Sequence, residues 1–133
     1  MTDEGRIRVL SADDHVLLRE GIATIIKHQE DMTLVSQACS GKEAIQQYRE
    51  HLPDVTLMDL RMPPGLSGMD ALLAILAEFP EARIIILTTF EGDEDVRRAL
   101  DAGARAYLLK SDPPKQLLQV IRRVHAGEKF LLT

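Results

Sequence analysis

Residues 54–59 read DVTLMD, an apolar run that ends in a carboxylate, and residues 83–88 read RIIILT, which ends in a hydroxyl. Consecutive aliphatic and β-branched side chains of this kind favour strands that are buried on both faces. Longer segments with helical periodicity separate these runs from each other and from similar runs on either side. The alternation predicts repeated β-α units built around a parallel sheet.

Working outward, the pattern predicts five strands and five helices. The strands are expected at Ile7–Ala12, Thr33–Ala38, Asp54–Asp59, Arg83–Thr88 and Ala106–Leu109. The helices are expected at Val16–Ile26, from the N-cap Ser40 to about His51, at Gly68–Phe79, at Asp93–Asp101, and from Pro113 or Pro114 to near Gly127. These units predict the α/β class, with one doubly wound parallel sheet in a single domain.

Local signals refine several of these elements. The first helix is expected to turn inward Leu17, Leu18, Ile22, Ile25 and Ile26, and the last helix Leu117, Leu118, Ile121 and Val124. Ser40, followed three residues later by Glu43, has the pattern of a capping box. Gly103 is expected to end the fourth helix in a left-handed conformation. The strand Thr33–Ala38 is polar enough to be an edge strand.

Composition excludes several classes of protein. The 133 residues are 45% hydrophobic and 28% charged, as in a globular domain. A net charge of −5 argues against nucleic-acid binding by this segment itself. The N-terminus is charged and has no apolar stretch, so we expect no signal peptide, no membrane contact and a cytoplasmic protein. His15, His28, His51 and His125 lack metal-ligand spacing and are expected at the surface or as capping residues.

The residues that follow the strands carry the chemistry, because ligands of open parallel sheets bind beyond the carboxyl ends of the strands. Asp13 and Asp14, Asp59, Thr88 and Lys110 all fall at such ends. Clustered carboxylates repel one another, and Mg²⁺ with its preference for oxygen ligands relieves that repulsion. An aspartate beside Mg²⁺ and a lysine is suited to attack a phosphoryl group, which gives an aspartyl phosphate.

Four motifs together resemble the receiver domain of two-component response regulators. They are VLSADDH (9–15), LMDLRMP (57–63), LTTF (87–90) and AYLLK (106–110), and they span nearly the whole chain. The motifs DDH (13–15) and AGARAYLLK (102–110) are most similar to those of the subfamily with a C-terminal LuxR/NarL-type helix-turn-helix. The resemblance implies a flavodoxin-like receiver fold with strand order 2-1-3-4-5. It also implies a regulator that is phosphorylated without being an enzyme for external substrates.

The resemblance assigns roles by position. Asp59 would be the phosphoacceptor. Asp13 and Asp14 would hold Mg²⁺ together with Asp59 and the Arg61 backbone carbonyl. Lys110 would bind the phosphoryl group.

The same resemblance assigns the response to phosphorylation. Thr88 would be the switch hydroxyl, and Tyr107 the aromatic residue that follows it. Arg61 and Phe90 would flank the hydrolytic water and set the lifetime of the phosphate, with bulky Phe90 slowing its self-catalysed loss. One departure is that four residues, rather than the family's three, separate Pro63 from Gly68, which puts the loop beside the metal site in doubt.

Other functions fit the residues less well. A phosphohydrolase of the haloacid dehalogenase type needs an aspartate two residues after the nucleophile, where this chain has Arg61. A flavin or nucleotide carrier needs a phosphate cradle after the first strand, where this chain has Asp13-Asp14-His15. A stand-alone phosphotransfer shuttle and a degenerate receiver that acts by protein binding remain as alternatives.

The resemblance also implies partners. We expect a sensor histidine kinase as phosphoryl donor and a homodimer on phosphorylation. Residues 1–133 are interpreted as the receiver domain, and DNA would be bound only through a C-terminal domain beyond Thr133.

Overall fold

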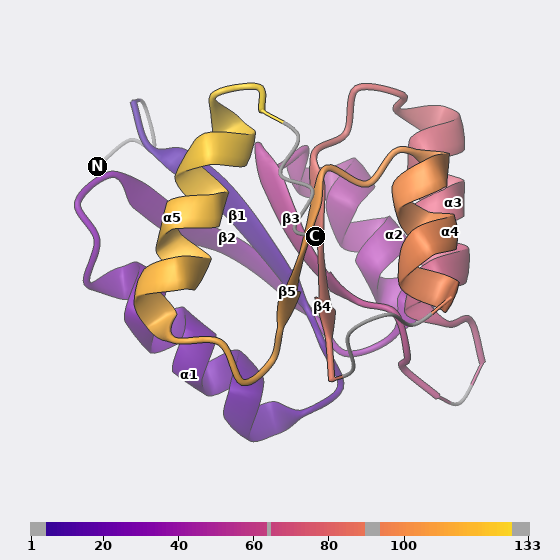
Figure 1. Ribbon diagram of the computed structural model, residues 1–133, viewed down its shortest axis with the longest axis horizontal. Helices are drawn as coiled ribbons and strands as arrows, with labels where there is room; N and C mark the ends of the chain where they lie inside the picture. The colour runs from indigo at the N-terminus through magenta and orange to yellow at the C-terminus, as the bar shows by residue number, and fades with distance from the viewer. Residues whose placement is uncertain (1–4, 64, 90–93, 129–133) are drawn as a thin grey trace.

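The computed structural model describes residues 5–63, 65–89 and 94–128, and its elements alternate as the sequence predicts (Figure 1). In chain order they are β1 (Ile7–Ala12), α1 (Val16–Lys27), β2 (Met32–Ala38), α2 (Gly41–His51), β3 (Val55–Asp59), α3 (Gly68–Glu78), β4 (Ile84–Thr88), α4 (Glu94–Ala102), β5 (Ala106–Leu109) and α5 (Pro114–His125). Each element lies within one residue of its predicted bounds at either end, or within two at the end of α5. The predicted start of α4 at Asp93 lies outside the described residues.

The strands form one parallel sheet in the order β2-β1-β3-β4-β5, which confirms the predicted fold class and strand order. Helices α1 and α5 lie against one face, and α2, α3 and α4 against the other (Figure 1). The polar strand β2 is at an edge, as predicted. No helix in the described part of the chain is long and apolar enough to cross a membrane.

Both faces of the central strands are covered, which explains their continuous apolar sequence. In β4, Ile84 and Ile86 pack into the core beneath α2, α3 and α4, whereas Ile85 and Leu87 pack into the core beneath α1 and α5. Every residue of β3 and β4 is buried, including Asp59 and Thr88 at their ends. Asp59 and Thr88 are therefore held at the buried ends of the two central strands.

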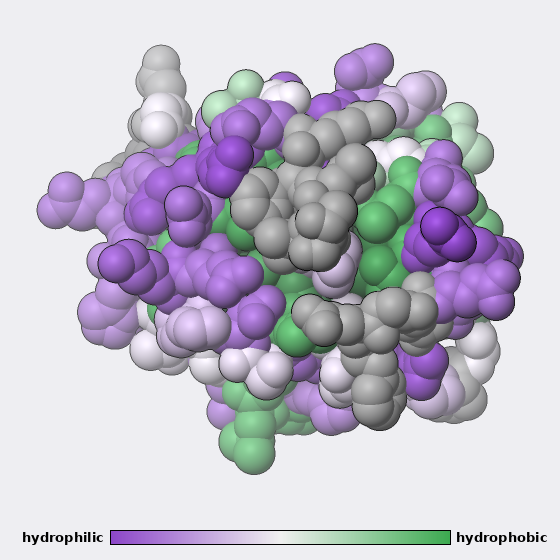
Figure 2. All heavy atoms as spheres, viewed as in Figure 1, coloured by the Kyte–Doolittle hydropathy of each residue, from purple (hydrophilic) through white to green (hydrophobic). Residues whose placement is uncertain are grey.

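The first turn of α1 departs from the prediction. Leu17 was expected to pack inward, but it is 85% exposed, and Val16 is also exposed. In the same turn Leu18 is partly buried and packs against the core beneath α1 and α5, so the helix turns Leu18 rather than Leu17 toward the sheet. A hydrophobic group projects at the lower edge of Figure 2, where Figure 1 draws the start of α1.

The caps of α2 and α4 largely follow the prediction. The Ser40 hydroxyl accepts a hydrogen bond from the Glu43 amide at 3.1 Å. The Glu43 carboxylate, however, accepts from the Cys39 amide at 3.1 Å, so the reciprocal bond of a capping box is displaced by one residue. Gly103 follows α4 with a φ of +129°, a conformation that favours glycine.

The loop between Pro63 and Gly68, which departs from the family pattern, makes close contacts at its C-terminal end. Ser67 and Asp70 form a reciprocal capping box at the start of α3. A Cβ on Gly68 would overlap the backbone carbonyl of Asp59, and one on Gly41 would overlap the carbonyl of Leu66. These close approaches hold the end of the loop against β3 and α2, next to the predicted acceptor.

Candidate functional site

The sheet brings the predicted residues to one edge. Ala12 pairs with Met58, so the next residues, Asp13 and Asp59, emerge side by side from β1 and β3. On the other side, Thr88 pairs with Leu109, and the backbone amide of Lys110 donates to the Thr88 carbonyl at 2.7 Å. Parallel pairing therefore assembles groups that lie up to 97 positions apart in the sequence.

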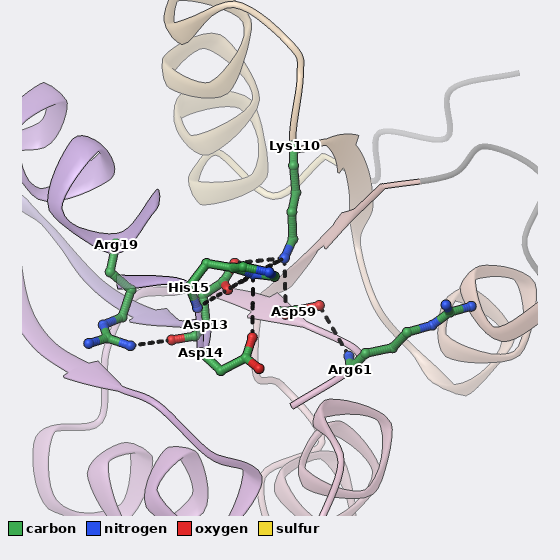
Figure 3. Close-up of polar contacts among 7 residues, drawn as sticks. All are labelled: Asp13, Asp14, His15, Arg19, Asp59, Arg61 and Lys110. Carbon is green, nitrogen blue, oxygen red and sulfur yellow. Dashed lines mark hydrogen bonds and ion pairs between the residues drawn. The ribbon is translucent and has the colours of Figure 1, made fainter. Parts of the chain in front are cut away.

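Asp59 lies at the centre of the cluster (Figure 3). It is 4% exposed. Its Oδ1 accepts a hydrogen bond from the Arg61 amide at 3.1 Å, and its Oδ2 accepts one from Lys110 Nζ at 3.0 Å. The carboxylate is thus oriented from both sides.

Lys110 is the cation that the carboxylates share. Its side chain is 12% exposed, and Nζ also lies 3.1 Å from Asp13 Oδ2. The turn that follows it is closed by Asp112, whose carboxylate accepts from the Leu109 amide at 2.8 Å. One ammonium group therefore faces two buried carboxylates.

The surroundings of Asp59 favour the protonated form of its carboxyl group. Burial raises the pKa of Asp59, and the negative charge of Asp13 adds to this effect; the hydrogen bonds from Arg61 and Lys110 oppose it. The net direction is upward, so the hydrogen bonds from Arg61 and Lys110 do not fully offset the effect of burial.

Two carboxylate oxygens in the cluster lack hydrogen bonds. Asp13 Oδ2 and Asp14 Oδ1 are buried and accept none, although Lys110 Nζ lies near the former as an ion pair. Ligand atoms of Asp13, Asp14, His15 and Asp59 all lie within 4.8 Å of one another. Oxygen atoms without hydrogen bonds, gathered at this spacing, fit a hard divalent cation such as Mg²⁺.

His15 is the site residue that the sequence reasoning missed. It was expected at the surface or as a capping residue. It occupies the N-cap position of α1 and its side chain is 63% exposed, but that side chain makes no cap hydrogen bond. Its Nδ1 instead lies 2.9 Å from Asp13 Oδ1 and 3.0 Å from Lys110 Nζ. Its place directly after two predicted ligands was the available signal.

Arg19 is a second residue that the sequence did not single out. Its guanidinium donates from α1 to the backbone carbonyl of Asp13 at 2.6 Å (Figure 3). This bond fixes the turn between β1 and α1, on which both acidic residues lie.

The remaining predicted residues surround the cluster. Thr88 is buried at the end of β4, and Tyr107 is half-buried on β5, packed against the core beneath α2, α3 and α4. Arg61 is exposed and contacts Asp59 through its backbone amide. A role for its carbonyl as a metal ligand stays a prediction. Phe90 lies outside the described residues.

Comparison with known proteins places the chain in a large group. The family model described as response regulator receiver domain matches residues 9–122. Among curated proteins, the oxygen regulatory protein NreC of Staphylococcus epidermidis is 43% identical over 125 residues, and that of Staphylococcus aureus is 45% identical over 125 residues. These alignments cover 94% of this chain, which spans 57% and 58% of the relatives' lengths.

Solved structures agree with this placement. A LuxR-family two-component response regulator from Aurantimonas sp. SI85-9A1 superposes with a TM-score of 0.88 at 35% identity, covering 96% of this chain and 89% of that one. The receiver domain of the putative response regulator NarL from Mycobacterium tuberculosis gives a TM-score of 0.85 at 31% identity, covering 92% and 98%.

Proposed function

The chain belongs to the response regulator receiver domain family, whose members are phosphoacceptor regulators of two-component signalling, and from that premise we propose that it is phosphorylated on Asp59. The observation that carries the proposal is the buried Asp59 carboxylate, 3.0 Å from Lys110 Nζ and beside the buried carboxylate oxygens of Asp13 and Asp14 that accept no hydrogen bond.

The transfer requires a nucleophile and a means of stabilising the phosphoryl charge. An oxygen of Asp59 forms the new O–P bond while the P–N bond of a phosphohistidine donor breaks. The bonding electrons leave with the imidazole nitrogen, which then takes a proton from water. Lys110 donates to a phosphoryl oxygen in place of the Asp59 oxygen that it contacts now.

Asp13, Asp14, Asp59 and the Arg61 carbonyl would hold Mg²⁺. The ion would neutralise the excess carboxylate charge and the charge that develops on the transferring oxygens. The fit rests on the cluster of oxygen ligands and on the buried oxygens of Asp13 and Asp14 that accept no hydrogen bond.

The switch would run through the residues nearest the phosphate. Inverting a two-state equilibrium from 1:99 to 99:1 needs about 5.5 kcal/mol. Hydrogen bonds to a charged group contribute roughly 1.5–3 kcal/mol each. New bonds from Lys110 and Thr88 to the phosphate would supply much of this energy. Tyr107, on the strand beside Thr88, would change rotamer with it.

The lifetime of the phosphate would depend on Arg61 and Phe90. A bulky Phe90 would restrict the attacking water and slow self-catalysed dephosphorylation. Replacing it with alanine is expected to speed the decay of the phosphorylated protein, measured as loss of phosphorylated mass with time. An unchanged decay rate would contradict this role.

The full-length protein would be a cytoplasmic transcription regulator that receives phosphate from a sensor histidine kinase. The relatives are named as an oxygen regulatory protein and as LuxR-family regulators, one of them DNA-binding. We propose that residues 1–133 are the receiver domain, that DNA contact belongs to a further C-terminal domain, and that phosphorylation promotes a homodimer.

The test is the intact mass after incubation with acetyl phosphate, with and without Mg²⁺. We expect one added phosphoryl group that requires both Mg²⁺ and Asp59. Asp59→Asn should abolish the addition, and the control Asp101→Asn, at an exposed position on α4, should not. Addition without Mg²⁺, or to the Asp59→Asn variant, would contradict the proposal.

A further inference from the structure

His15 differs from the neighbouring carboxylates because it brings a nitrogen to the cation site. Its Nδ1 lies 2.9 Å from Asp13 Oδ1 and 3.4 Å from Asp14 Oδ1. Figure 3 shows the ring lying beside the carboxylates of Asp13 and Asp14, next to the end of the Lys110 side chain.

These separations are those of ligands on one metal ion. Two ligands about 2.1 Å from an octahedral ion, at right angles to each other, lie about 3.0 Å apart. The distance to Asp13 Oδ1 matches this value and the distance to Asp14 Oδ1 is somewhat longer, so an ion could contact the nitrogen and the two oxygens after a small movement of the side chains.

Nδ1 faces an acceptor and a donor, and it can bond only one of them at a time. Lys110 Nζ, at 3.0 Å, can only donate, and an ionised Asp13 can only accept. Nδ1 therefore offers either its lone pair to the ammonium group or a proton to the carboxylate, and it cannot bond both at once. The two neighbours have further partners, since Lys110 Nζ also donates to Asp59 Oδ2 at 3.0 Å and Asp13 Oδ1 also accepts from the His15 amide at 2.8 Å. The buried Asp13 Oδ2 accepts no hydrogen bond in either case. A divalent cation satisfies the imidazole and both carboxylates together.

We propose that His15 Nδ1 is a ligand at this site for borderline transition ions such as Co²⁺, and that it gives the site a preference for them over Mg²⁺. The inference rests on the proposed function, because it uses the same carboxylates. Mg²⁺ takes oxygen ligands and retains waters, whereas imidazole suits transition ions. His15 would then select which metal accompanies phosphorylation.

The test compares Co²⁺ and Mg²⁺ binding by calorimetry in the wild type, in His15→Ala and in the control His28→Ala. His28 is an exposed histidine at the other end of α1, whose Nδ1 contacts the Thr24 carbonyl. We expect His15→Ala to weaken Co²⁺ binding about tenfold or more and to leave Mg²⁺ binding within about twofold. His28→Ala should change neither.

Nuclear magnetic resonance of the Co²⁺-loaded protein gives a second readout. A coordinated imidazole shows a ring N–H signal displaced far outside the normal range by the paramagnetic ion. This signal should be present in the wild type and in His28→Ala, and lost in His15→Ala.

The outcomes separate the inference from the proposed function. If the wild type binds Mg²⁺ and His15→Ala leaves Co²⁺ affinity and the displaced signal unchanged, the inference is overturned while the proposed function stands. An equal loss of both ions would also overturn it, because His15 would then act on the site as a whole. If Mg²⁺ fails to bind the wild type, the proposed function fails.

Discussion

Replacing Lys110 with methionine tests the electrostatic account of the site without phosphorylation. Methionine keeps most of the apolar stem and removes the ammonium group, which lies 3.0 Å from Asp59 Oδ2 and 3.1 Å from Asp13 Oδ2. Both carboxylates are buried and Lys110 is largely buried. Truncating one partner of a buried ion pair typically costs roughly 3–5 kcal/mol, because the other charge is left uncompensated. We expect a loss of about 3 kcal/mol at neutral pH in a chelator, a fall in Tm of about 10 °C.

Saturating Mg²⁺ should reduce this loss by about half or more, because the ion supplies the missing positive charge. The assay is urea and thermal unfolding followed by circular dichroism, with Lys115→Met as the control. Lys115 is exposed on α5, and its replacement should cost no more than about 0.5 kcal/mol. A loss below about 1 kcal/mol in chelator, or one that Mg²⁺ leaves unchanged, would refute the reasoning.

Two further predictions concern the acceptor and its backbone. The raised pKa of Asp59 means that the folded state holds this proton more tightly than the unfolded chain, so its contribution to stability falls as pH rises from about 3.9 through the folded pKa. Asp59→Asn should therefore stabilise the metal-free protein at pH 7, with the gain shrinking toward pH 4 in urea titrations; a gain independent of pH would contradict this. Gly68→Ala would push a methyl group into the Asp59 carbonyl and should cost about 2 kcal/mol or more, whereas Gly21→Ala meets open space and should be neutral or stabilising. Equal effects at both glycines would show that the close approach at Gly68 is unimportant.

The sequence predicted the sheet well because its apolar strand segments were easily told apart from the helical segments between them. Consecutive aliphatic residues in β3 and β4 required cover on both faces, and parallel pairing then brought Asp13, Asp59 and Lys110 to one edge. Residues far apart in the chain could be placed together because topology, rather than side-chain detail, determines which strand ends meet.

Side-chain direction at the helix starts was harder to predict. Leu17 fits the apolar period of α1, but the period does not reveal that Leu17 faces solvent while its neighbour Leu18 packs against the core. His15 has no metal-ligand spacing to another histidine, and only the turn after β1 brings its ring back over Asp13. The close contacts of Gly68 with the Asp59 backbone and of Gly41 with the Leu66 backbone likewise could not be predicted, because they join segments that are separate in the sequence.

The most direct test of the central claim is to locate the phosphoryl group after reaction with acetyl phosphate and Mg²⁺. Borohydride reduces an aspartyl phosphate to homoserine, and trypsin releases residues 50–61, EHLPDVTLMDLR, a peptide that carries Asp54 as an internal comparison. Fragment masses should place homoserine at position 59 alone. Homoserine at position 54, or in the peptide that carries Asp13 and Asp14, would contradict the account.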